Sequence, residues 1–354
     1  MSDPACIDLP THVRDRDIFY DVEGRIFVVL GFIQPPDRIL AFLKYIPDQY
    51  GDWQSGDTKY KRIFWGSVSS TVDGMNLLPS NYIAKDAHFG TDLLEPPREN
   101  VERYFNPEAR LKEIIDGGPK DSLEDLAKNG AETLHDALGI SIDHLGVAGS
   151  ILWKGHSLGK SDINMNIYGF DYSWKLHDNY ELLTEGREGA RLRELPDWEH
   201  AMSRVHARVP IIKSEDLQNL FSRRKALCLG NICIGITPIL LPGESPIQHG
   251  SETYEAVSNT PQTIIMDVEN ADFGIFHPAI YEGQSSPLTL LNGDFVDRIM
   301  VYDGAFGGLL RTGDRVEVTG IVQKVSPTKG RDPFSQIMVG TKAGAGKEFI
   351  RLVT

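Results

Sequence analysis

Cysteine is scarce in this chain. Three cysteines occur in 354 residues, Cys6, Cys228 and Cys233, which are too few for the disulfide framework that holds small secreted domains together. Their spacing also lacks the paired ligands of a structural zinc site. Because Cys228 and Cys233 lie in an apolar stretch, we expect buried thiols that pack as small hydrophobic side chains. This cysteine usage favours a reducing cytoplasm.

Positive charge is also in short supply, because 36 Lys and Arg residues face 50 Asp and Glu residues and leave a formal charge of −14. Proteins hold long duplex DNA with Lys and Arg side chains that displace counterions from the phosphates. Long duplex DNA is therefore an unfavourable partner, although a local basic groove is compatible with this charge. Residues 187–225 carry nine Lys or Arg and six Asp or Glu, 9 − 6 = +3, which fits a solvated helical surface or a phosphate-binding patch.

No apolar run is long and uninterrupted enough to predict a membrane span. The longest uncharged stretch, residues 226–243, contains Asn231, Pro238 and several glycines, so we expect two buried strands and a turn there. The residues that follow Met1 lack the basic and then apolar order of a secretion signal. We expect no membrane partner.

The chain does have the composition of a globular protein, with 41% hydrophobic and 24% charged residues. Its length is enough for two or three domains. We expect an α+β fold with a small β-rich domain over residues 1–95, a central α/β domain over residues 96–260, and a β-rich, barrel-like domain over residues 261–354. The pair Pro96 and Pro97 marks the first boundary.

Apolar residues between turn signals predict short strands at both ends of the chain. The expected strands cover residues 18–20, 25–32, 38–45, 60–65 and 82–84 in the first segment, and 263–268, 295–302 and 315–324 in the last. The glycine-rich residues 340–347 have the wrong spacing for a P-loop, and no long helix follows them. We expect a hairpin loop there.

Helices are predicted between these segments. Asn106 and Pro107 have the N-cap and first-turn order of a helix that ends at the next glycines. Ser122 is expected to cap a second helix. Gly130 lowers the propensity of that helix by about 1 kcal/mol relative to alanine, so the helix can split there. Two more helices are expected at residues 198–209 and 214–227.

The most informative segment begins with a short apolar strand at residues 145–148, which runs into Gly149 and Ser150. Residues 151–153 can then start a helix. A strand that leads through a small turn into a helix start leaves backbone N–H groups free to bind anionic oxygens. We therefore expect a phosphate-binding turn at Gly149 and Ser150.

A second strand follows the turn, and its side chains alternate between two faces. The expected core face holds Ile163, Met165 and Ile167, and the opposite face holds Asp162, Asn164 and Asn166. Oxygen-bearing side chains two residues apart can reach one metal ion, and Mg²⁺ takes oxygen ligands and leaves positions for substrate phosphates. Asp162 and Asn164 are therefore the candidate metal ligands.

The loop that joins the turn to this strand carries further candidates. Lys160 and Ser161 directly precede the strand and are candidate nucleotide-binding residues, while Lys154 and Lys160 fit either exposed lysines or contacts to phosphate. His144 and His156 flank the motif. We expect structural roles for both histidines, although a histidine beside phosphates can also act as an acid or an electrostatic partner.

At these residues the sequence resembles the nucleotidyltransferase superfamily that includes DNA polymerase beta, whose pattern is Gly-Ser, about ten residues, and then Asp-x-Asp on a strand. The match consists of Gly149, Ser150, Asp162 and the position of Asn164. The order of a β-rich front, this core and a β-rich tail is similar to a group of archaeal-type predicted nucleotidyltransferases. The core resemblance covers about 30 residues.

The resemblance implies a mixed sheet backed by helices that binds a nucleoside triphosphate with Mg²⁺ and transfers its nucleotidyl group as pyrophosphate leaves. Gly149 and Ser150 would hold the β and γ phosphates. Asp162 and its partner at position 164 would hold the metals, and a third carboxylate from a later strand would activate the attacking hydroxyl. Two metals would then clamp the entering and leaving oxygens.

The sequence departs from this pattern at two positions. Asn164 replaces the second aspartate, and residues 227–240 contain no Asp or Glu to supply the third carboxylate. Asp171, Asp267 and Glu269 are candidate replacements. Each ~1.4 kcal/mol of lost transition-state stabilisation slows a reaction tenfold, so the loss of metal ligands bears directly on catalysis.

Two functional hypotheses follow. The first is an enzyme that transfers a nucleotidyl group through Asp162 to an acceptor, which could be RNA, a protein or a small molecule. The second is a catalytically inactive relative that binds a nucleotide or a macromolecular partner. The missing carboxylates favour the second hypothesis, and the retained Gly-Ser turn favours the first.

Overall fold

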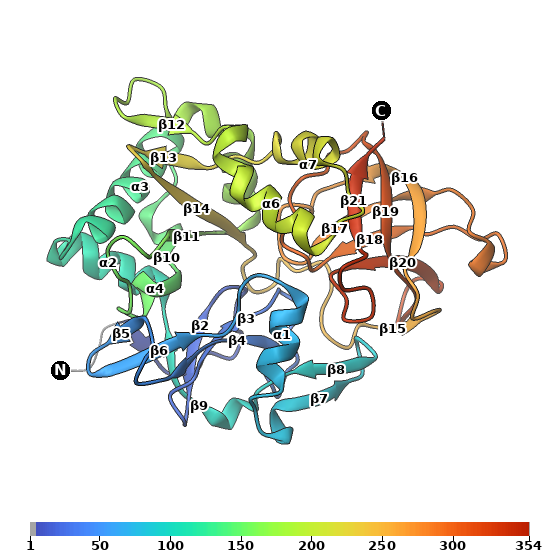
Figure 1. Ribbon diagram of the computed structural model, residues 1–354, viewed down its shortest axis with the longest axis horizontal. Coiled ribbons are helices and arrows are strands. Elements are labelled where there is room, and N and C mark those ends of the chain that lie inside the picture. Colours follow the sequence, from blue (N-terminus) through green and yellow to red (C-terminus); the bar gives the residue numbers. More distant parts are fainter. Residues whose placement is uncertain (1–4, 354) are drawn as a thin grey trace.

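The computed structural model describes residues 5–353. Within them the chain forms three large sheets, one small hairpin and seven α-helices, so the α+β fold expected from the sequence is confirmed. The N-terminal and C-terminal parts are rich in strands, and most helices lie around the middle sheet (Figure 1). No helix in the described range is long and apolar enough to cross a membrane.

The N-terminal sheet has the strand order β1-β9-β2-β3-β4-β6-β5 and is antiparallel throughout. Helix α1 and the hairpin β7-β8 flank it (Figure 1). Since β9 is a neighbour of β2, this sheet continues past Pro97, while the boundary at residue 95 stays a prediction. The elements are β1 (Cys6–Ile7), β2 (Ile18–Asp21), β3 (Ile26–Val29), β4 (Ala41–Pro47), β5 (Trp53–Ser55), β6 (Thr58–Arg62), α1 (Val68–Met75), β7 (Ile83–Asp86), β8 (Thr91–Leu94) and β9 (Val101–Phe105).

The central sheet is mixed, with the order β10-β11-β14-β13-β12, in which β11 and β14 alone run parallel. Helices α2 and α3 cover one face of it and bury its apolar residues. The elements are α2 (Pro107–Gly117), α3 (Ser122–Leu138), β10 (Leu145–Val147), α4 (Gly149–Leu152), β11 (Ile163–Tyr168), α5 (Phe170–Asp178), β12 (Ala190–Leu192), β13 (Leu227–Leu229) and β14 (Ile232–Ile239).

The C-terminal sheet closes into a small barrel. Strand β19 is long enough to pair with β16 on one side and with β20 on the other, and β17 and β18 complete the ring. Helices α6 and α7 pack onto the barrel core. The elements are α6 (Glu199–Arg208), α7 (Ser214–Phe221), β15 (Glu252–Ala256), β16 (Gln262–Asn270), β17 (Ala279–Ser285), β18 (Arg298–Val301), β19 (Arg315–Pro327), β20 (Phe334–Val339) and β21 (Phe349–Leu352).

Several local expectations require correction. The side chain of Asp121, not Ser122, caps α3, because its Oδ1 accepts hydrogen bonds from the backbone N–H groups of the first turn. The helix expected to reach residue 227 ends at Phe221, where the chain turns before β13. The two cysteines expected as thiols, Cys228 and Cys233, form a disulfide between directly paired positions of β13 and β14. A five-residue separation across a hairpin brings the two side chains together on one face of the sheet.

Gly130 does not split α3, which is continuous from Ser122 to Leu138. Instead it allows the helix to lie directly on the central sheet. A Cβ at this position would stand 2.7 Å from Cδ1 of Ile234 and 3.2 Å from Sδ of Met165, two buried side chains of β14 and β11. The glycine is therefore required by packing against the sheet, and its low helix propensity is tolerated.

The packing at Gly130 predicts that Gly130→Ala destabilises the protein. Alanine gains about 1 kcal/mol of helix propensity, whereas overpacking a closed core costs about 1–3 kcal/mol. Denaturant unfolding should show a net loss of stability. Gly117→Ala is the matched control, since a Cβ at the end of α2 meets open space, and it should be neutral or stabilising. Equal stabilisation by both substitutions would contradict the close approach of α3 to the sheet.

A buried polar network joins the hairpin β7-β8 to the C-terminal barrel. Asp86 accepts a hydrogen bond from His249 at 2.6 Å and from the backbone N–H of Phe89 at 2.7 Å. Glu95 is 2% exposed beside Asp86. Burial, together with the charge of Asp86, raises the pKa of Glu95 to about 8. The Glu95 carboxyl is therefore protonated near neutral pH, even though Arg38, whose Nε lies 3.9 Å from Oε2 of Glu95, acts to lower this pKa.

This network predicts that Glu95→Gln changes the pH dependence of stability. The unfolded carboxyl loses its proton near pH 4.5, whereas the folded one keeps it to about pH 8, so wild-type stability should fall as the pH rises between these values. Glutamine mimics the protonated acid. The variant should match the wild type near pH 4 and exceed it by a few kcal/mol at pH 8, as measured by unfolding at both pH values. Glu99 is exposed, so Glu99→Gln should leave the pH dependence of stability as in the wild type. If stability changes with pH in the same way in Glu95→Gln and in the wild type, Glu95 is not protonated at neutral pH.

Candidate functional site

Gly149 and Asn164 lie side by side at the ends of β10 and β11. The two strands are antiparallel, with Val147 opposite Met165, so the residues that follow β10 run alongside the start of β11. Gly149 has φ +60°, and a Cβ there would stand 3.0 Å from Nδ2 of Asn164. The glycine is required both by its backbone conformation and by the adjacent amide.

The alternation expected along β11 is confirmed. Ile163, Met165 and Ile167 are buried in the core beneath the helices. On the other face Asp162 is exposed and Asn164 is partly exposed, while Asn166 is fully buried and donates to the hydroxyl of Tyr168 at 3.1 Å. The end of β11 that carries Asp162 and Asn164 is therefore the accessible end.

The third carboxylate of a two-metal site is missing from this face. Asn164 pairs with Gly235 of the parallel strand β14, and a Cβ on Gly235 would stand 3.4 Å from Oδ1 of Asn164. An acid on β14 would have to occupy this position. No group of three His, Cys, Asp or Glu side chains between residues 5 and 353 could hold a metal ion. Asp162 and Asn164 can supply oxygens to one Mg²⁺ beside a bound phosphate, but they do not form a two-metal centre.

The candidate replacement acids lie elsewhere. Asp171 is exposed in the first turn of α5. Asp267 belongs to the barrel and forms an exposed ion pair with Arg315 at 2.8 Å. Glu269 is on the same strand, β16. None of these three acids lies on the strands that carry Asp162 and Asn164, so their positions do not support a role as the missing carboxylate.

The Gly-Ser turn offers less to an anion than its sequence suggests. The helix that follows, α4, covers only four residues, Gly149–Leu152, so it contributes little of the dipole that makes long helix starts attractive to phosphates. Ser150 is 8% exposed. Side chains from other elements must then supply most of the positive charge for a bound phosphate.

The loop residues expected near phosphate have partners within the protein. Lys160 forms an exposed ion pair with Asp52 at 2.9 Å, and the Ser161 hydroxyl accepts from the backbone N–H of Ser157 at 3.0 Å. Lys154 contacts Glu113 at 3.0 Å. These contacts stabilise the loop. The roles of Lys160 and Ser161 in nucleotide binding stay predictions.

The two flanking histidines also lie in structural contacts. Nε2 of His156 is 2.8 Å from Oδ2 of Asp121, the cap of α3. The ring of His144 packs on that of Tyr172, with centroids 4.5 Å apart.

Lys44 of β4 is the main residue that the sequence reasoning missed. Burial and, to a smaller extent, the charges of Arg62 and Arg16 lower the pKa of Lys44 to about 7, while the Asp162 carboxylate acts to raise it. Within the described residues the Lys44 ammonium has no ion-pair partner and lies over the rings of Phe42 and Phe64. The N-terminal sheet therefore presents a poorly neutralised cation to the Asp162 end of β11.

Two arginines outside the N-terminal sheet, Arg193 and Arg224, add to this positive charge. Burial lowers the pKa of Arg193, which follows β12, while Asp197 and Asp162 act to raise it. Burial lowers the pKa of Arg224 to about 10, and Arg193 contributes to that lowering. The buried Nε atoms of both arginines have no hydrogen-bond partner in the described structure.

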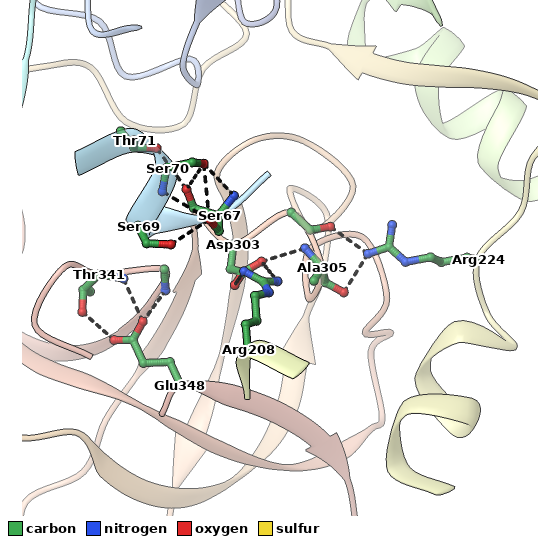
Figure 2. Close-up of polar contacts among 12 residues, drawn as sticks. Ser67, Ser69, Ser70, Thr71, Arg208, Arg224, Asp303, Ala305, Thr341 and Glu348 are labelled. Atoms are coloured by element: carbon green, nitrogen blue, oxygen red, sulfur yellow. Dashed lines mark hydrogen bonds and ion pairs between the residues drawn. The ribbon is translucent and has the colours of Figure 1, made fainter. Parts of the chain in front are cut away.

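The barrel holds Arg224 in place. Its guanidinium donates to the carbonyls of Gly304 and Ala305, both at 2.7 Å, and Arg208 binds Asp303 of the same loop at 2.7 Å. Figure 2 shows both arginines converging on this loop. We call Arg16, Lys44, Arg62, Arg193 and Arg224 the central cation cluster.

The central cation cluster carries more positive charge than the carboxylates near it neutralise. Arg16 pairs with Asp15 at 3.4 Å. Arg62 donates to a backbone carbonyl at 2.9 Å and lies over the ring of Trp65. Neither Lys44 nor Arg62 has an ion-pair partner among the described residues, and Asp162 is the carboxylate that acts on Lys44. Segments far apart in the sequence supply these cations, so no local motif could have revealed them.

Comparison with known proteins adds an evolutionary relative without a known function. The chain is 25% identical over 355 residues to the uncharacterized protein MJ1086 of Methanocaldococcus jannaschii, and the alignment covers 96% of this chain and 99% of the relative. No protein-family model matches the chain. No solved structure matches it either.

The charges around Lys44 predict that two substitutions shift its pKa in opposite directions. Asp162→Asn removes the carboxylate that favours the charged amine, so the pKa of Lys44 should fall further below about 7, whereas Arg62→Gln should raise it. NMR titration of labelled lysine, with the signal assigned through Lys44→Met, measures both changes. Asp52→Asn removes the partner of Lys160 and serves as the control. A Lys44 pKa unmoved by Asp162→Asn would show that β4 and β11 do not face each other.

Proposed function

We propose that this protein binds the triphosphate of a nucleotide at the junction of its N-terminal and central sheets. The observation that carries the proposal is that Lys44 and Arg62 meet at the Phe64 side of the N-terminal sheet without an ion-pair partner among the described residues, and that Asp162 is the carboxylate acting on Lys44. Bringing like charges together in a half-buried site is unfavourable. A polyphosphate would reverse this cost, because its oxygens can satisfy several cations at once.

Each group has a role in this proposal. Lys44 and Arg62 hold phosphate oxygens from the N-terminal sheet, and Arg193 approaches from the central sheet. Gly149 lets the turn lie close against the amide of Asn164. Asp162 can share one Mg²⁺ with the phosphates, an arrangement that requires few protein ligands.

Of the two functional hypotheses, the site better supports a catalytically inactive protein that binds a nucleotide. Gly235 stands beside Asn164 on β14, and this strand contains no Asp or Glu that could activate an attacking hydroxyl. Nucleotidyl transfer to an RNA, protein or small-molecule acceptor is the second candidate, and the retained Asp162 and Gly-Ser turn favour it. For either function we place the protein in the cytoplasm, where nucleoside triphosphates are found, although a disulfide is unusual there.

Binding of inorganic tripolyphosphate and ATP, each with and without Mg²⁺, tests the proposal. A ligand at 100 times its dissociation constant should stabilise the fold by ~2.7 kcal/mol. Lys44→Met should weaken the binding of both ligands roughly tenfold or more, since hydrogen bonds to charged groups contribute about 1.5–3 kcal/mol. Because a bound anion keeps Lys44 protonated, wild-type affinity should decline above about pH 7 relative to that of Lys44→Met.

The control variant is Lys61→Met, which removes an exposed charge from the neighbouring position on β6 and should leave affinity within twofold. Absence of binding by both ligands would abandon the proposal. Release of pyrophosphate that requires Mg²⁺ and disappears in Asp162→Asn would establish the second candidate instead.

A further inference from the structure

Trp65 is an exposed aromatic side chain beside the central cation cluster. It is 59% exposed, which is unusual for the largest apolar side chain. The guanidinium of Arg62 lies 4.6 Å from the centre of its ring. One face of the indole therefore rests on a cation of the proposed phosphate site, while much of the ring is open to solvent.

The backbone that carries the indole is held by hydrogen bonds. The backbone N–H of Trp65 donates to Oγ of Ser70 at 3.2 Å, and the Ser70 hydroxyl donates to the carbonyl of Ser67 at 2.8 Å. Figure 2 shows these hydroxyls gathered at the start of α1. A ring held from both its backbone and one face loses little freedom when a ligand covers the other face.

The aromatic surroundings continue toward Lys44. The rings of Phe42 and Phe64 lie 4.1 Å apart, and the Lys44 ammonium stands 5.1 Å from the Phe64 ring. Arg62 also donates to the carbonyl of Phe64 at 2.9 Å. Phe64 therefore links the two cations, because its ring contacts the Lys44 ammonium and its carbonyl accepts from Arg62, which in turn lies over Trp65.

We propose that Trp65 stacks against the base of the nucleotide whose phosphates lie on Lys44 and Arg62. This inference rests on the proposed function and adds to it the side chain that holds the base. Stacking uses the flat face that every base has. The site should therefore accept all four common nucleoside triphosphates, with purines bound more tightly than pyrimidines because their rings are larger.

The experiment compares inorganic tripolyphosphate, which has no base, with ATP, GTP, CTP and UTP by calorimetry on the full chain. Trp65→Ala should weaken the binding of ATP by between about fivefold and a hundredfold and leave the affinity for tripolyphosphate unchanged. Trp65→Phe should restore most of the ATP affinity. Tyr50→Ala removes another highly exposed aromatic side chain and should leave the affinities for ATP and tripolyphosphate unchanged.

Each alternative outcome has a distinct meaning. If tripolyphosphate binds as tightly as ATP to the wild type, the stacking is overturned and the phosphate site survives. Equal weakening of both ligands by Trp65→Ala would show that Trp65 only positions Arg62, which also overturns stacking. Strong selection of one base would overturn it too. If a single-stranded oligonucleotide without a triphosphate binds more tightly than ATP and this binding requires Trp65, the ligand is a nucleic acid and the proposal is overturned. If neither tripolyphosphate nor any of the four nucleotides binds, the proposed function itself is wrong.

Discussion

The burial of Trp153 is the interaction on which the arrangement of the site depends. This side chain follows the short helix α4 and is 1% exposed. Its ring lies 5.3 Å from that of Tyr45, 5.2 Å from that of Tyr60 and 6.5 Å from that of Tyr20, all on the N-terminal sheet. Removing so large a buried side chain typically costs 3–5 kcal/mol. The contact fixes the Gly-Ser turn against the strands that carry Lys44 and Arg62.

This docking explains how an acidic protein can hold a basic site. The formal charge of −14 describes the whole chain, yet charge acts over about a Debye length, roughly 8–10 Å at ordinary ionic strength. The N-terminal part contributes three cations of the central cation cluster, and the segments after β12 and α7 contribute one each. The excess of Asp and Glu elsewhere keeps the molecule acidic without neutralising Lys44 and Arg62.

The site also differs from the two-metal arrangement implied by the resemblance to nucleotidyltransferases. There, carboxylates collect divalent cations and the metals collect phosphates. Here one carboxylate remains at Asp162, glycine occupies the position of the third at Gly235, and side-chain cations surround the face. The proposal of a polyphosphate-binding site follows from this difference, because positive side chains bind phosphate but do not remove a proton from an acceptor.

Local features were predictable because neighbouring residues determine them. Alternation assigned the two faces of β11, and Asn106 caps α2 as its sequence indicates. The role of Gly130 was not predictable, since its reason lies in side chains of two strands that α3 covers. The same holds for the Cys228–Cys233 disulfide, which depends on the hairpin register. The sequence alone determined the Gly149 turn and the position of Asp162, whereas Lys44, Arg62 and Arg193 joined them only through tertiary packing, because charge is shared through space and not along the chain.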